Sequence, residues 1–211
     1  MITQNLANSK DAWLKMEPVS FLKLEVLQEK LSIHKLDATL LDAAIFHETN
    51  RMRVTQQLEP LLPSQKAFEA AREHSRWMVK TGNLSHEGAE FDGRKSTPLA
   101  RLKHHGISPA MAAENVAFGF ILEYESGRPV YSKKSGSKMV FSYTADGPPL
   151  PARNYVEMAR AIVTQFMESP EHRKNILLKG LTHSGMGVAL LPDKDGMDRV
   201  YVTQKFFALA L

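Results

Sequence analysis

The chain has 211 residues, of which 43% are apolar and 24% are charged, a composition typical of one soluble globular domain with some additional segments. No run of about 18 apolar residues occurs, which excludes a membrane-spanning helix, and the lack of cysteine excludes disulfides, thiolate metal sites and cysteine nucleophiles. The net charge of +4 is mild and the basic residues are scattered, so we expect no nucleic-acid binding and at most weak association with membrane surfaces.

The N-terminal region, residues 1–37, is predicted to be a helical extension of the main domain. Leu24, Leu27 and Leu31 recur at helical spacing, which predicts a helix over 20–35. Such a helix packs on the domain as a brace or contacts a partner, and the pattern favours the brace.

Three helices are predicted in the next part of the chain. The first begins at Asp37, a residue type that caps helices, and ends before Pro60. The second begins after the capping residue Ser64 and is stopped by Gly82. A short helical piece over 99–104 follows within a turn-rich segment.

The second half of the chain begins with a segment, 123–153, in which glycine and proline separate two β-prone pieces. This pattern predicts a long hairpin or flap inserted into the domain. A helix is predicted over 154–168, and a short helix with proline at its first position follows it. Two strands over 186–191 and 199–207 flank a turn and are predicted to form a hairpin.

Two histidine-bearing segments and a Glu-Asn pair carry the main functional signal. They are Asn83-Leu84-Ser85-His86, Ala113-Glu114-Asn115-Val116-Ala117 and Ser169-Pro170-Glu171-His172-Arg173-Lys174-Asn175-Ile176-Leu177. In this order, and with Gly185-Met186-Gly187-Val188 and Tyr201-Val202-Thr203-Gln204-Lys205-Phe206 downstream, they closely resemble the CAP superfamily of SCP-like domains. The resemblance implies an α+β fold, a three-layer α-β-α sandwich with a small, mainly antiparallel central sheet, over residues 38–211.

In that family, two histidines and two glutamates from distant segments converge on one cleft. The resemblance places these ligand-binding positions at His86, Glu114, Glu168 and His172, with Glu171 as the alternative second acid. Since imidazoles are common metal ligands, His86 and His172 are candidates to hold zinc or another divalent metal. Without the resemblance, each histidine is more simply a surface or hydrogen-bonded residue, and Glu114 is equally well a buried structural carboxylate.

The resemblance also implies a function and a location. It favours an extracytoplasmic ligand-binding or interaction module, secreted or periplasmic after removal of a signal peptide, with a small molecule, lipid or peptide as its ligand. The alternative is a metal-assisted hydrolase that acts on peptide or cell-wall substrates. A serine hydrolase is disfavoured because the chain lacks a Gly-x-Ser-x-Gly elbow and because Ser85, next to His86, is poorly placed as a nucleophile.

Overall fold

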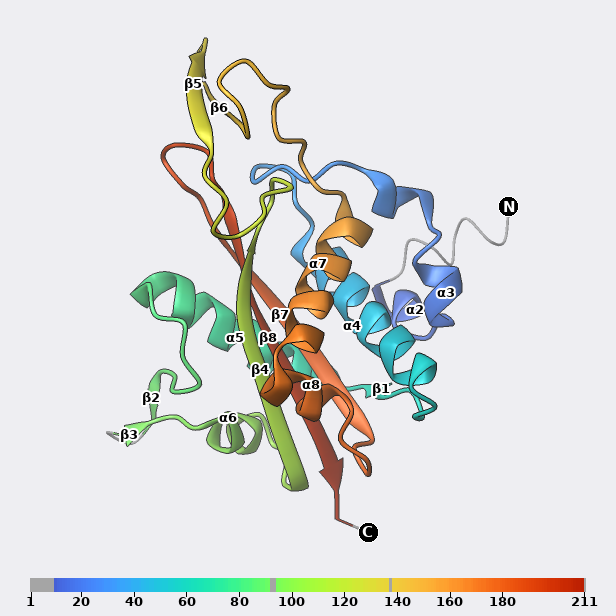
Figure 1. Cartoon of the computed structure of the whole chain (residues 1–211). Coiled ribbons are helices and arrows are strands. Elements are labelled where there is room, and N and C mark those ends of the chain that lie inside the picture. Colours follow the sequence, from blue (N-terminus) through green and yellow to red (C-terminus); the bar gives the residue numbers. More distant parts are fainter. Residues whose placement is uncertain (1–9, 92–93, 137, 211) are drawn as a thin grey trace.

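The computed structural model describes residues 10–91, 94–136 and 138–210 and contains a four-stranded central sheet (Figure 1). The strand order is β1-β7-β8-β4. The strands are β1 (Leu62–Pro63), β4 (Pro109–Phe120), β7 (His183–Leu191) and β8 (Arg199–Leu209). β1 pairs with β7 in parallel, whereas β8 pairs with both β7 and β4 in antiparallel fashion. The mainly antiparallel sheet predicted from the sequence is therefore confirmed.

Helices cover both faces of this sheet, which gives the α-β-α layering. α5 (Gln65–Thr81) lies against β7 and β8 on one face. α4 (Ala38–Thr55) and α7 (Tyr155–Glu168) pack together on the opposite face (Figure 1). Two shorter helices, α6 (Pro98–His104) and α8 (Pro170–Ile176), contact β4. The three-layer sandwich is thus confirmed.

Two glycines of β7 allow the backbone of α5 to approach the sheet closely. A Cβ atom at Gly185 would overlap the backbone of Ala67 and Phe68, and one at Gly187 would overlap the backbone of Arg72. Because a Cβ cannot fit at either position, these two glycines set the distance between the helix and the sheet.

The helix starts predicted at Asp37 and Ser64 are confirmed by side-chain caps. The Asp37 carboxylate accepts hydrogen bonds from the N–H groups of Thr39 and Leu40, and the Ser64 hydroxyl accepts one from Ala67. At the end of α5, Gly82 adopts φ +70°, the left-handed conformation that favours glycine after a helix.

The continuous helix predicted over 20–35 is wrong. The N-terminal region instead forms α2 (Lys10–Trp13), α3 (Pro18–Phe21) and a single 3-10 turn, η1 (Glu25–Gln28). Beyond this turn the chain runs alongside the start of α7, where the Leu31 N–H donates to the Arg153 carbonyl at 2.7 Å. Tertiary hydrogen bonds therefore replace the helical ones that the leucine spacing predicts.

The N-terminal extension packs on the domain as a brace. Trp13, Phe21 and Leu27 are buried in the main apolar core. The His47 ring of α4 stacks on Phe21 with ring centroids 4.2 Å apart, and its Nε2 lies 2.7 Å from the Trp13 carbonyl oxygen. The predicted boundaries of this extension and of the main domain also include residues 1–9 and 211, which lie outside the described residues.

The predicted insertion contains a hairpin of its own. β5 (Tyr131–Ser135) and β6 (Lys138–Ser142) pair in antiparallel fashion and form a separate sheet that projects beyond the end of the central one (Figure 1). A second small hairpin, β2 (Glu90–Phe91) with β3 (Arg94–Lys95), lies between α5 and α6. Within the described ranges, no helix has the length and apolar character needed to span a membrane.

Candidate functional site

The strand that carries Glu114 and Asn115 was not predicted from the sequence. β4 follows a turn-rich segment, but Val116, Phe118 and Phe120 alternate with small residues, a period of two that is typical of a strand. Since successive residues of a strand face opposite sides, Glu114 points toward the layer of α5 and α6, and Asn115 toward the layer of α4, α7 and α8.

Glu114 lies at the centre of a buried ion-pair cluster. Arg101 Nη2 donates to both carboxylate oxygens of Glu114, at 2.9 and 2.8 Å, and Lys205 Nζ donates to Oε2. His86 Nδ1 lies 3.0 Å from Oε1. Burial opposes ionisation of Glu114, but the His86 hydrogen bond and the charges of Lys205 and Arg101 outweigh it and lower the pKa to about 2. The carboxylate is therefore ionised at any physiological pH.

Neither cation of this cluster was identified as a site residue from the sequence. Arg101 projects from α6 and Lys205 from β8, and both side chains are almost completely buried. Burial lowers the pKa of Lys205 to about 8, although the charge of Glu114 acts in the opposite direction. One sequence signal could have revealed Lys205: the polar triplet Thr203-Gln204-Lys205 interrupts an otherwise apolar strand. A lysine buried in such a strand is expected to have an anionic partner, because buried charges are nearly always paired.

His86 connects this buried cluster to solvent. Its side chain is 51% exposed, while its Nδ1 faces the ionised Glu114 carboxylate. The imidazole therefore donates its Nδ1–H to the carboxylate, and Nε2 is the ring nitrogen left for a ligand. A histidine held in this way by a carboxylate is typical of metal-ligating and proton-accepting imidazoles.

The structure places His172 beside the same stretch of β4. Asn115 Nδ2 donates to the His172 carbonyl oxygen at 3.1 Å, and Asn175 Nδ2 donates to the Glu114 carbonyl oxygen at 3.1 Å, so two amides join α8 to β4. The half-buried His172 ring packs against Phe166. Burial lowers the pKa of His172, and the neighbouring His86 lowers it further.

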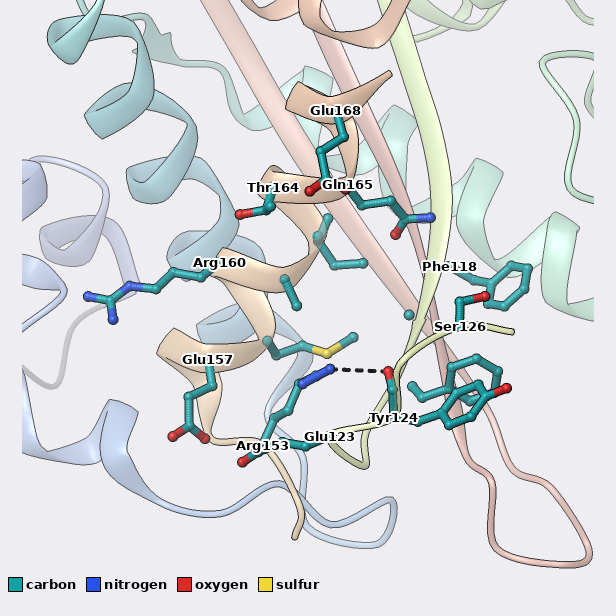
Figure 2. Close-up of a pocket in the computed structure, with 15 residues that line it drawn as sticks. Phe118, Glu123, Tyr124, Ser126, Arg153, Glu157, Arg160, Thr164, Gln165 and Glu168 are labelled. Carbon is teal, nitrogen blue, oxygen red and sulfur yellow. Dashed lines mark hydrogen bonds between the residues drawn. The ribbon is translucent and has the colours of Figure 1, made fainter. Parts of the chain in front are cut away.

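Glu168 and Glu171 are not joined to this cluster by any hydrogen bond or ion pair in the described part of the chain. Glu168, the last residue of α7, is exposed and lines a groove between α7 and β4 (Figure 2). Glu171 is also exposed and acts on His172 only through its charge, which opposes the fall in pKa. The assignment of either acid to a shared ligand site stays a prediction.

The donor set fits a weakly held metal better than a tight structural one. Among the residues that the structure describes, no group of three or more His, Asp or Glu side chains is arranged around a common point. Both oxygens of Glu114 are already engaged by Arg101, Lys205 and His86. A divalent ion would therefore take its protein ligands from His86 and His172, and water or a bound ligand would complete its coordination.

Two further polar side chains lie in the interior near this cluster. His74 is buried in the core, and its Nε2–H donates to the Ser85 carbonyl oxygen at 2.8 Å. Burial lowers its pKa to about 4, so it is a neutral core histidine. Gln204 points inward, where its Nε2 donates to Thr49 Oγ1 at 2.9 Å and its Oε1 accepts from Asn115.

Comparisons with known proteins agree with this architecture. The family model described as "CAP: Cysteine-rich secretory protein family" matches residues 46–206. An extracellular protein containing an SCP domain from Bacillus anthracis is similar in structure, with 21% identity, a TM-score of 0.53 and coverage of 80% of this chain. An outer surface protein from Borrelia burgdorferi is similar with 16% identity, a TM-score of 0.52 and coverage of 84%.

The two structural relatives differ in how much of their length is matched. The match covers 40% of the Bacillus protein and 98% of the Borrelia protein, so this chain spans well under half of the first. No curated protein matches the chain significantly. At these identities the likeness shows the fold.

Proposed function

Since the chain belongs to the CAP, or cysteine-rich secretory protein, family, we propose that it is an extracytoplasmic ligand-binding module whose ligand contacts His86 and His172. The observation that carries the proposal is the Glu114 cluster, which fixes His86 with its Nε2 toward solvent. The extracytoplasmic location is supported by the printed descriptions of the two relatives, one as extracellular and one as an outer surface protein.

The cluster suits a binding role because it holds the imidazole in one orientation. Arg101 and Lys205 fix the carboxylate, and the carboxylate fixes the ring of His86. A side chain whose position is set by buried neighbours loses little conformational entropy when it binds, so the site is preorganised. Zinc or another divalent metal is the ligand that we propose for the two imidazoles, because imidazole nitrogens are common metal ligands.

The metal-assisted hydrolase is the second candidate, and the carboxylate–imidazole pair is the observation that favours it. The role open to Glu114 is limited, however, because a carboxyl group with a pKa of about 2 does not donate a proton near neutral pH. Its two cationic partners also make it a poor proton acceptor. In a hydrolase, the general base would have to be the exposed Nε2 of His86.

The experiment that tests the proposal is titration of tag-free protein with Zn²⁺ by isothermal calorimetry. We expect the wild-type chain to bind Zn²⁺, and the His86→Ala, His172→Ala double variant to lose at least about tenfold in affinity, equivalent to about 1.4 kcal/mol. A matched control is the His34→Ala, His104→Ala double variant, which removes two exposed histidines elsewhere. Equal Zn²⁺ binding by both double variants would contradict the proposal.

A parallel assay separates the two candidates. Purified wild-type protein is incubated with Zn²⁺ and a mixture of peptides and peptidoglycan fragments, and the products are followed by mass spectrometry. A binding module leaves the mixture unchanged. Turnover that disappears on chelation and in the His86→Ala variant would instead favour the hydrolase.

A further inference from the structure

The outer edge of β4 presents backbone groups that no neighbouring strand pairs. In an antiparallel ladder, alternate residues turn their N–H and C=O groups away from the partner strand. The Glu114 carbonyl accepts from Asn175, which lies on the side away from β8, so Glu114 is one of these outward residues. The same alternation turns the backbone groups of Val116, Phe118 and Phe120 outward.

This edge is occupied at both ends and open between them. Asn175 occupies it at Glu114, while beyond Phe120 the chain pairs with its own segment 151–153. There the Arg153 N–H donates to the Ile121 carbonyl, and the Glu123 N–H donates to the Pro151 carbonyl, both at 2.8 Å. Across 116–120, in the part of the chain that the structure describes, no hydrogen bond reaches the outward backbone groups. At about 3.4 Å per residue, the open stretch is about 17 Å long.

A groove lies directly beside this open edge. Phe118, Gly119 and Phe120 of β4 lie on one side of it, and Ala161, Gln165 and Glu168 of α7 lie on the other, above the buried Met158 and Ile162. Figure 2 shows Phe118, Gln165 and Glu168 around the groove. Its volume of about 600 Å³ is within the range of specific ligand sites. Phe118, Phe120 and Ala161 give the part of the groove beside the strand edge an apolar surface, Gln165 presents an amide there, and the rest of the lining is polar and carries charges of both signs.

We propose that this groove binds an extended peptide segment of about four or five residues, which adds a strand to the free edge of β4. The chain itself supplies the argument for a peptide backbone as the occupant, because segment 151–153 already pairs with the continuation of the same edge. The peptide fills the gap between that segment and Asn175, and its alternate side chains lie against Phe118 and Ala161.

Polar groups on the α7 wall define the chemistry of the peptide further. The Gln165 amide has no hydrogen-bond partner among the described residues and lies opposite the strand edge, where it can bond the second side of the peptide backbone (Figure 2). The Glu168 carboxylate lines the same groove one turn further along and has no described cationic partner. A lysine or arginine at the end of the peptide nearest α8 therefore complements it.

The experiment is a selection of phage-displayed random heptapeptides on the wild-type chain, with counter-selection on Gln165→Trp, a variant whose indole fills the groove from the exposed face of α7. We expect enriched peptides that alternate apolar residues and contain a basic residue. A synthetic copy of an enriched peptide should bind Gln165→Trp at least about tenfold more weakly than wild type. Glu168→Gln should weaken only those peptides that carry the basic residue.

A backbone variant tests strand addition itself. Phe118→Pro removes an outward N–H without removing a β4–β8 hydrogen bond, and Phe118→Ala removes the same ring but keeps the N–H. We expect the proline variant to lose binding relative to the alanine variant, and the peptide to slow amide exchange at Phe118 and Phe120 in wild type.

Three outcomes would overturn the proposal. One is the absence of any peptide enriched on wild type over Gln165→Trp. Another is equal binding by the proline and alanine variants. The third is a concentration-dependent dimer in sedimentation that Phe118→Pro abolishes, because this would show that the edge pairs with a second copy of the chain.

Discussion

Lys205 and Glu114 face each other at directly opposed positions of the β8–β4 ladder, and both side chains are almost completely buried. The cluster that they form with Arg101 contains two cations and one anion. Because charges in a protein interior are poorly screened, the position of each depends on the others. The free energy of unfolding and the orientation of the His86 ring therefore both depend on the Glu114–Lys205 pair.

Replacement of Lys205 by methionine should lower the free energy of unfolding by about 3 kcal/mol, because it leaves Glu114 buried with one cation fewer. Urea unfolding at pH 7 measures the effect. Lys134→Met, on the exposed hairpin strand β5, is the matched control and should unfold as wild type does. A Lys205 variant as stable as the control would show that the ion pair contributes nothing to stability.

Acid should weaken the attachment of the N-terminal brace through His47. Burial lowers the pKa of His47 to about 4 from a usual 6.5, so the unfolded chain binds a proton in this window that the folded chain does not. The stabilising contribution of His47 is therefore fully present above pH 6.5 and is lost as the pH falls toward 4. From pH 7 to pH 5, this site should remove about 2 kcal/mol from the free energy of unfolding.

His47→Gln isolates this contribution, because glutamine can still donate to the Trp13 carbonyl but does not titrate. Urea unfolding of both proteins at pH 7 and pH 5 should show a smaller loss for the variant. Groups such as His74 and Asp42 titrate in both proteins, so they cancel in the comparison. Equal losses would indicate that His47 is not the acid-sensitive residue.

The helices and the final hairpin could be predicted from the sequence because their signals are local. Asp37, Ser64 and Gly82 mark helix ends through their own backbone and side-chain chemistry, whatever the rest of the fold does. The helix over 20–35 was wrong because its leucines are buried by contacts with the main domain, which outweigh a local spacing pattern.

The site was predictable only in part. His86, Glu114 and His172 were named from their order in the chain, and the structure shows the direct contact between the first two. Arg101 and Lys205 were missed because their role depends on which strands become neighbours, and β4 itself was not predicted. No local pattern indicates that a lysine in the last strand will lie opposite a glutamate 91 residues earlier.

Gly187→Ala should be strongly destabilising, by at least about 3 kcal/mol, because the added methyl group would overlap the backbone of α5, which cannot move without separating a helix from the sheet. Gly119→Ala is a useful comparison. Its methyl group would meet only the flexible ends of Ile162 and Met158, so a smaller loss is expected. Thermal unfolding of both variants measures the difference, and a Gly187 variant no less stable than the Gly119 variant would refute this explanation.

Deletion of most of the insertion should leave the fold intact. β5 and β6 pair with each other and not with the central sheet, so replacing residues 127–148 with a short Gly-Ser linker breaks no strand of that sheet. Circular dichroism and a single cooperative urea transition are the expected results. A broad, non-cooperative transition would instead place the hairpin in the structural core.

The alternation of polar residues along β8 restricts how this strand can pair. Gln204 forms hydrogen bonds with the Asn115 amide and the Thr49 hydroxyl on one face, while Lys205 reaches Glu114 on the other. A slip of β8 by one residue would exchange the two faces, putting an ammonium group among amides and leaving Glu114 opposite an uncharged side chain. Misaligned sheets are thus penalised electrostatically as well as by packing, which favours a single register during folding.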